Sequence, residues 1–201
     1  SVFYLAGKFN FELGIKTAFK NALGPSSEIQ ENIKNEEHRK KIANHEAGHA
    51  VIAHELGFKI EHLCTRYAAG AYGYVKMKYK DDTVRQNIVE AIAVTNGGPE
   101  IEKILYGERP FHGHFGKNNV YDDKIAFDMA TKYAEHHPGE DHWVLLEEGR
   151  DLAREIIAAN LPAILTLGEA AYQKTLISGK EIGDIIELAR AKAINGPALS
   201  L

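Results

Sequence analysis

Two histidines, His45 and His49, stand four positions apart in this chain of 201 residues and constrain its fold more than any other feature. Residues i and i+4 lie almost above one another on an α-helix, so both imidazoles can reach one metal ion. A helix is expected because residues 36–56 contain no proline, apolar residues recur at helical spacing, and Gly57 follows as a C-terminal stop. The pair therefore predicts a helix that carries two metal ligands on one face.

Glu46 directly follows the first histidine and completes the pattern His-Glu-x-x-His. It lies about a quarter turn from His45 on a helix, which places its carboxylate beside the metal and within reach of a bound water. The pattern is the signature of zinc peptidases, in which this glutamate is the general base. The chain contains ten histidines, so a chance match on a charged helix is the alternative interpretation.

Composition argues against several classes of protein. A formal net charge of −4 disfavours a nucleic-acid-binding surface. The single cysteine, Cys64, excludes internal disulfides and predicts a reducing, cytoplasmic location. No apolar run approaches the roughly 18 residues that a membrane span needs, and no signal peptide is recognisable. The chain begins with Ser1 rather than methionine, which is compatible with a piece of a longer or membrane-anchored protein.

Three parts are predicted along the chain: an N-terminal helical appendage over 1–27, a metallopeptidase domain over 28–194 and a flexible tail over 195–201. The appendage contains an amphipathic stretch, residues 11–23, before a Gly-Pro-Ser-Ser break. Its apolar stripe consists of Phe11, Ile15, Ala18, Phe19 and Ala22. The stripe predicts a helix that packs on the main body, with a docking surface for a partner or a membrane as the alternative.

The rest of the chain predicts a mainly α fold with a small β-hairpin. Strands are expected at 59–67 and 72–79, and alternation in the second predicts one buried face. Asp82 or Thr83 is the expected cap of the next helix, and a break is expected at 96–99. The expected helices after the hairpin are 82–95, 99–106, 121–136, 141–159, 160–176 and 182–193.

Gly73, Tyr74 and Val75 begin the second expected strand. A strand edge beside the metal of a peptidase can hold the substrate in extended form through backbone pairing. These three residues are therefore the predicted substrate-binding residues. The alternative is that they are ordinary residues of a hairpin.

A catalytic zinc site keeps three protein ligands and one open position, so a third ligand is needed. The metzincin pattern fails, because Ile52 and Glu55 occupy the positions where that pattern has a glycine and a histidine. His54 is five residues past His49 and points away from it on a continuous helix. The other candidates are carboxylates on later elements: Glu100, Glu102, Asp122 and Asp123.

Residues 37–53 resemble the zinc helix of the FtsH-type proteases. Further segments match that family in its order, so that the resemblance covers roughly residues 36–190. They resemble its Leu-Gly-Tyr strand (71–75), its Gly-Gly-Arg-Ala-Ala-Glu segment (97–107), the segment that supplies an aspartate ligand (119–130) and its closing helical pair (152–182). The resemblance implies an FtsH protease-domain-like zincin fold.

Transferred by position, the resemblance makes Asp122 the third zinc ligand, with Asp123 as the alternative one residue away. Either aspartate also suits the N-cap of the helix that follows. The sequence departs from the family where Pro99 and Glu100 replace small and basic residues, and a His-Gly-His loop at 112–114 has no counterpart. The ATPase domain and membrane spans of the family are not found in this sequence.

The predicted function is that of a soluble zinc metalloendopeptidase that cleaves flexible peptides or unfolded protein segments. His45, His49 and Asp122 are the predicted ligands of Zn²⁺, and Glu46 is the predicted base that activates the attacking water. A separate ATPase partner and a homo-oligomer are both compatible with the sequence. The group that stabilises the oxyanion is left open among four residues: Tyr74, His112, His114 and Tyr121.

Two alternatives come from other classes of protein. One is a non-cleaving zinc-binding regulatory or scaffold protein on a peptidase fold, which the intact Glu46 disfavours. The other is a helical interaction module in which the histidine motif is coincidental. The histidines at 112 and 114 are expected to be solvated or to line the cleft, since His-x-His in a loop is a weak metal-binding signal.

Overall fold

The computed structural model describes residues 36–66, 73–107 and 122–195. The predicted appendage at 1–27, residues 196–201 of the predicted tail and the loop with His112 and His114 lie outside the described residues, as does Tyr121. Within the described part, no helix is both long enough and apolar enough to cross a membrane.

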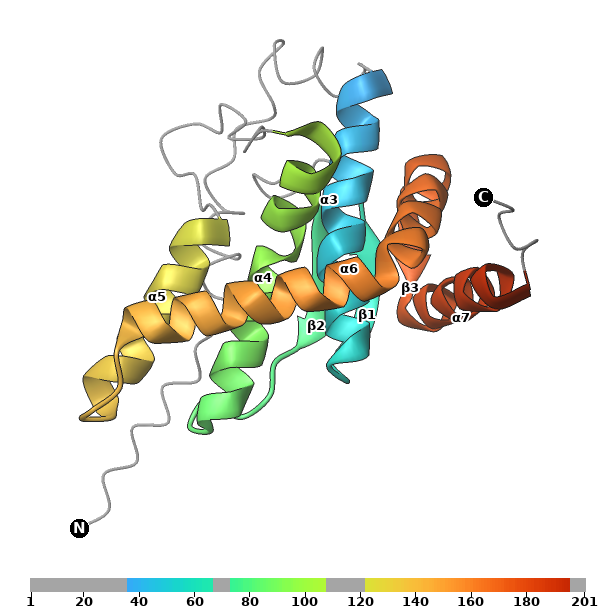
Figure 1. Ribbon diagram of the computed structural model, residues 1–201. Coiled ribbons are helices and arrows are strands. Elements are labelled where there is room, and N and C mark those ends of the chain that lie inside the picture. The colour runs from blue at the N-terminus through green and yellow to red at the C-terminus, as the bar shows by residue number, and fades with distance from the viewer. Residues whose placement is uncertain (1–35, 67–72, 108–121, 196–201) are drawn as a thin grey trace, which may run out of the picture.

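The described elements are mainly helical. They are α3 (Glu36–Glu55), β1 (Lys59–Cys64), β2 (Tyr74–Lys78), α4 (Arg85–Tyr106), α5 (Asp122–His136), α6 (His142–Lys174), β3 (Leu176–Ser178) and α7 (Gly179–Asn195). Figure 1 shows α6 running across α3 and α4, and these three helices pack on one another. One buried cluster includes Ile52 of α3 and Ile164 of α6, and a second includes Ile92 of α4 and Leu145 of α6. The predicted mainly α fold with a small sheet is confirmed.

The three strands form an antiparallel sheet in the order β2-β1-β3. Leu63 in β1 pairs with Val75 in β2 and with Ile177 in β3. The predicted hairpin is confirmed, and side chains in β2 alternate between partly buried and exposed from Val75 to Lys78, as predicted. β3 lies at the end of the expected helix 160–176 and in the gap before 182–193, and it was not predicted, because three residues are too few to show alternation. The order of the strands leaves β2 at one edge of the sheet.

The prediction of a helix break at 96–99 is wrong, since α4 continues through this stretch with Pro99 inside it. The glycines serve helix packing instead. A Cβ on Gly97 would lie 2.8 Å from the carbonyl oxygen of Gly48, and a Cβ on Gly48 would lie 2.5 Å from the carbonyl oxygen of Gly97. The backbones of α3 and α4 therefore touch at this crossing. Packing against α3 outweighs the local preference for a break and the hydrogen bond that Pro99 cannot donate.

The predicted capping of this helix is also wrong. The N-cap of α4 is Val84, which makes no side-chain cap hydrogen bond. Asp81 instead accepts hydrogen bonds from the backbone N–H of Thr83 at 3.0 Å and from its hydroxyl at 2.8 Å. A tight turn of this kind competes locally with helix capping, so the N-cap lies one or two residues later than predicted.

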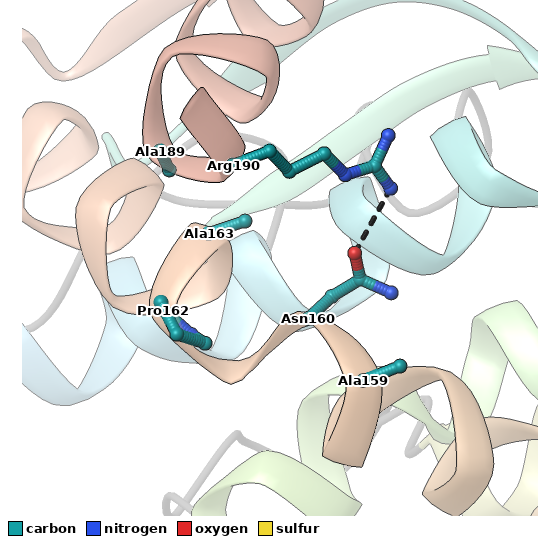
Figure 2. Close-up of a pocket in the computed structure, with 6 residues that line it drawn as sticks. All are labelled: Ala159, Asn160, Pro162, Ala163, Ala189 and Arg190. Carbon is teal, nitrogen blue, oxygen red and sulfur yellow. Dashed lines mark hydrogen bonds between the residues drawn. The ribbon is translucent and has the colours of Figure 1, made fainter. Parts of the chain in front are cut away.

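The predicted change of helix near Asn160 is confirmed as a kink within α6, where Asn160 has φ −124° and ψ 15°. Asn160 accepts a hydrogen bond of 2.9 Å from Arg190 of α7, and Arg190 also forms an ion pair with Glu55 at the end of α3. Figure 2 shows the small pocket beside this contact, which is otherwise lined by alanines and Pro162. The kink is thus held by polar contacts to two other helices.

Candidate metal centre

α3 and α5 bring three potential metal ligands to one point. The Nε2 atoms of His45 and His49 lie 3.0 Å apart. Asp122, the first residue of α5, places its Oδ2 atom 3.0 Å from Nε2 of His45 and 3.4 Å from Nε2 of His49. Among the described residues, these three form the group of histidine, cysteine and acidic side chains that can share one ion.

The donor set fits zinc. Bonds of 2.0–2.2 Å in a tetrahedral arrangement place neighbouring ligand atoms about 3.3–3.6 Å apart, close to the separations between these three atoms. Two imidazole nitrogens and one carboxylate oxygen are a ligand set that leaves a fourth position open for water or substrate. His45 and Asp122 are only partly buried, so the group is reachable from solvent.

The other ring nitrogens of the two histidines are held by α4. Nδ1 of His49 lies 2.7 Å from the carbonyl oxygen of Val94, a contact in which Nδ1–H donates and Nε2 keeps its lone pair for a metal. Nδ1 of His45 lies 3.1 Å from Oε1 of Glu102, whose side chain is 5% exposed. Such contacts fix the orientation of ligating imidazoles and raise their basicity.

The other candidate ligands are placed elsewhere. Glu102 lies on the far side of the His45 ring from Asp122 and so orients a ligand rather than joining the group. Glu100 forms an ion pair with Arg154 of α6, with 3.1 Å between Oε2 and Nε. Asp123 is not a member of the group that can share one ion. The geometry therefore favours Asp122, the residue to which the FtsH resemblance pointed.

Two glycines leave the room that the site needs. A Cβ on Gly98 of α4 would lie 2.3 Å from Nε2 of His45. A Cβ on Gly73, just before β2, would lie 2.6 Å from Oε1 of Glu46. Local sequence patterns indicate only a helix breaker at Gly98, because a contact between distant segments leaves no local signal. The residue before the edge strand and a residue of α4 thus both lie against the His-Glu-x-x-His motif of α3.

The charges of the group depend strongly on one another. Burial raises the pKa of the Glu46 carboxyl to about 7, although the neighbouring imidazoles oppose the shift. Burial also favours the neutral form of Asp122, but the two imidazoles outweigh it and hold its pKa well below its usual range. Burial disfavours a charged His45, yet Asp122 and Glu102 raise its pKa well above the ordinary value. Three carboxylates around two imidazoles make a site that attracts a cation.

Two tyrosines differ in their relation to the site. The hydroxyl of Tyr74, a predicted oxyanion-stabilising candidate, lies 3.3 Å from Nε2 of His62 on β1. Tyr79 was not considered from the sequence, but burial and then the charge of Asp122 raise its pKa to about 12, and its hydroxyl bonds with Thr95. Thr95 follows Val94, whose carbonyl holds His49, so Tyr79 contacts the same turn of α4.

Comparisons with known proteins agree with the geometry at a coarse level. No protein-family model matches this chain. It is similar to the ATP-dependent zinc metalloprotease FtsH of Acidimicrobium ferrooxidans, with 22% identity over 198 aligned residues that cover 81% of this chain and 30% of the relative. It is also similar to the FtsH of Ruminiclostridium cellulolyticum, with 28% identity over 178 aligned residues that cover 80% of this chain and 28% of the relative.

The chain thus spans less than a third of the length of each relative. These similarities support a distant relationship to FtsH-related zinc metalloproteases. The mainly helical fold with its three-stranded sheet is consistent with an FtsH protease-domain-like fold. The relatives are named as zinc enzymes, which agrees with the donor set formed by two histidines and one aspartate.

Proposed function

We propose that this protein is a zinc metallopeptidase in which His45, His49 and Asp122 hold the ion and Glu46 is the catalytic base. The observation that carries the proposal is the convergence of the three ligand atoms from α3 and α5 beside a buried glutamate. A zinc ion held there would polarise the scissile carbonyl and acidify the attacking water.

Glu46 takes a proton from the attacking water as the oxygen bonds to the carbonyl carbon. It then gives this proton to the amine that leaves when the C–N bond breaks. Gly73 has no side chain, and this leaves room for the carboxylate of Glu46 beside the start of β2. Glu102 and the carbonyl of Val94 keep both imidazoles directed at the ion throughout.

The substrate is proposed to bind along β2 as an extended strand. β2 is an edge strand, and Gly73 at its start touches the catalytic base. Gly73, Tyr74 and Val75 can therefore pair with a substrate backbone whose scissile bond reaches Glu46. This mode requires an extended chain, which favours flexible peptides and unfolded protein segments over folded proteins.

Partners and location are further parts of the proposal. The relatives are named ATP-dependent, so a separate ATPase that delivers unfolded substrate to this chain is a proposed partner. A homo-oligomer and a cytoplasmic location are also proposed, the latter from the single cysteine.

The test compares the wild type with Glu46→Gln and with Glu37→Gln as a control on the same helix. Glu37 has a side chain that is 76% exposed and pairs with Lys41 rather than with the metal group. Zinc content is measured in the purified proteins, and cleavage is followed on casein and on a peptide library. The proposal expects zinc in all three proteins and cleavage lost only in Glu46→Gln.

Two results would contradict it. Absence of zinc from the wild type after reconstitution would show that the motif is coincidental. Zinc binding without cleavage by the wild type, with and without an added ATPase, would favour the non-cleaving scaffold instead.

A further inference from the structure

An exposed aromatic patch, formed by Phe127 of α5 with His142 and Trp143 of α6, lies outside the proposed active site. Ring centroids are 5.7 Å apart for Phe127 and Trp143, 4.9 Å for His142 and Trp143, and 5.4 Å for Phe127 and His142. Trp143 is 57% exposed and Phe127 is 38% exposed, and the next residue, Val144, is 48% exposed. The three rings contact one another. Clustered exposed aromatic side chains are typical of interaction surfaces.

The helical spacing of Trp143 with Leu146 and Gly149 predicts that Trp143 is buried, and its exposure shows that this prediction is wrong. The true core positions of the first turns are Leu145 and Leu146, which are buried. Trp143 is instead fixed beside the N-cap, where its backbone N–H donates to Asp141 at 2.7 Å. A large apolar side chain is thus held in solvent by a rigid helix start.

The surroundings of the aromatic patch are acidic. Residues 122–151 contain nine Asp and Glu residues but only three Lys and Arg residues. Asp128, Asp141 and Glu147 have side chains that are 48%, 60% and 58% exposed. A partner for this surface should therefore combine an apolar stripe with positive charge.

We propose that the aromatic patch binds residues 11–23 of the same chain. This stretch carries the amphipathic stripe that includes Ile15 and Phe19, and its two lysines, Lys16 and Lys20, stand between and beside the stripe residues. Residues 1–23 contain three lysines and one glutamate, so their charge is opposite to that of 122–151. The stripe supplies apolar side chains for the rings, and the lysines supply partners for the acidic rim.

The connection is long enough for this contact. The 13 steps from Leu23 to Glu36 reach about 45 Å when extended. Arg39, near the start of α3, lies over the ring of Tyr172 on α6, 4.9 Å from its centroid. From Tyr172 back to Trp143, the helical path of α6 measures about 44 Å, and the kink at Asn160 shortens the direct distance. The segment can therefore reach the patch of its own chain.

Trp143 is the only tryptophan in the sequence, so its fluorescence reports on the patch in the full chain. The experiment compares the wild type with Ile15→Asp/Phe19→Asp, using Thr17→Asp/Asn21→Asp as a control that adds the same charge to the polar side of the stretch. The readouts are the emission maximum and quenching by acrylamide. The proposal expects a shielded indole in the wild type and in the control. Quenching should rise by about twofold in the stripe variant, because a bound partner excludes water from an aromatic anchor.

Circular dichroism and the thermal midpoint show whether each variant is folded. A Phe127→Ser variant changes the aromatic patch instead of residues 11–23 and is measured by the same fluorescence readouts. A wild-type indole that is already fully accessible would overturn the proposal, as would equal effects of the stripe and control variants. If shielding of the indole increases with protein concentration and is the same in the stripe variant, the aromatic patch binds a second copy of the chain instead. Shielding that depends on the stripe at every concentration supports the intramolecular contact.

Discussion

The metal centre and the kink of α6 both join three elements through polar side chains, but they leave very different amounts of room. At the metal centre, a Cβ added to Gly98 or Gly73 would collide with His45 or Glu46. At the kink, the contact between Asn160 and Arg190 lies beside a pocket lined largely by alanines (Figure 2). The difference shows that the first region depends on close backbone approach and the second on side-chain contacts that can adjust. Changes should therefore be transmitted to zinc binding from the first region and not from the second.

Removing a ligand should have the largest effect. Asp122→Ala is expected to weaken zinc binding by more than about 100-fold, since loss of a ligand exceeds the 10- to 100-fold typical of contacts that only orient a ligand. Asp123→Ala, at the next position, is the matched control and should change the affinity little, because Asp123 is not in the group. Competition with a chromogenic chelator measures both. The reverse order of effects would move the ligand by one residue and undo the geometric assignment.

The second largest loss of zinc affinity is expected when one methyl group is added beside a ligand. In Gly98→Ala the new Cβ would lie 2.3 Å from Nε2 of His45, so the imidazole or α4 must move. A displaced ligand is expected to cost about 10- to 100-fold in zinc affinity. Gly183→Ala is the control, because it also places a methyl group beside a histidine in a helix, but at an ordinary 3.4 Å from His54. Similar affinities for the two variants would show that the metal centre is not sterically closed.

A smaller effect is expected when only the charge behind His45 is removed. Glu102→Gln keeps the volume and an oxygen acceptor near Nδ1 of His45 but loses the negative charge, and about a tenfold loss of zinc affinity is expected. Glu100→Gln, two residues earlier on the same helix, breaks the pair with Arg154 and should leave the affinity unchanged. The same chelator competition distinguishes them, with thermal unfolding as the check on folding.

Some parts of the metal centre could be predicted from the sequence and others could not, for a physical reason. The spacing of His45 and His49 is a local property of one helix, so the pair and its helix were predictable. Asp122 lies 77 positions from His45, and residue spacing alone left it level with Glu100, Glu102 and Asp123; only the resemblance ranked it first. The contact that orients His49 comes from a backbone carbonyl, which carries no residue-specific signal.

The glycines of α4 show that local sequence patterns can also give a wrong prediction. Local propensity interprets Gly97 and Gly98 followed by Pro99 as a break, and that interpretation holds for an isolated peptide. In the folded chain, Gly97 lies against Gly48 and Gly98 lies against His45, so absent side chains are what allow α3 and α4 to meet. The helix continues because the tertiary contact outweighs local preference. Expectations from short windows fail most readily where two distant segments touch through their backbones.

The smallest effect on zinc is expected from the kink. Arg190→Met removes the donor to Asn160, which is 8% exposed, and the cation that pairs with Glu55. Leaving a buried acceptor without its donor should lower the free energy of unfolding by about 1–3 kcal/mol, measured by urea denaturation. Zinc affinity should stay within about twofold of the wild type, because separated sites without shared partners behave independently. A large loss of zinc affinity in this variant would show that the kink is mechanically coupled to α3 through Glu55, and the contrast between the two regions would then fail.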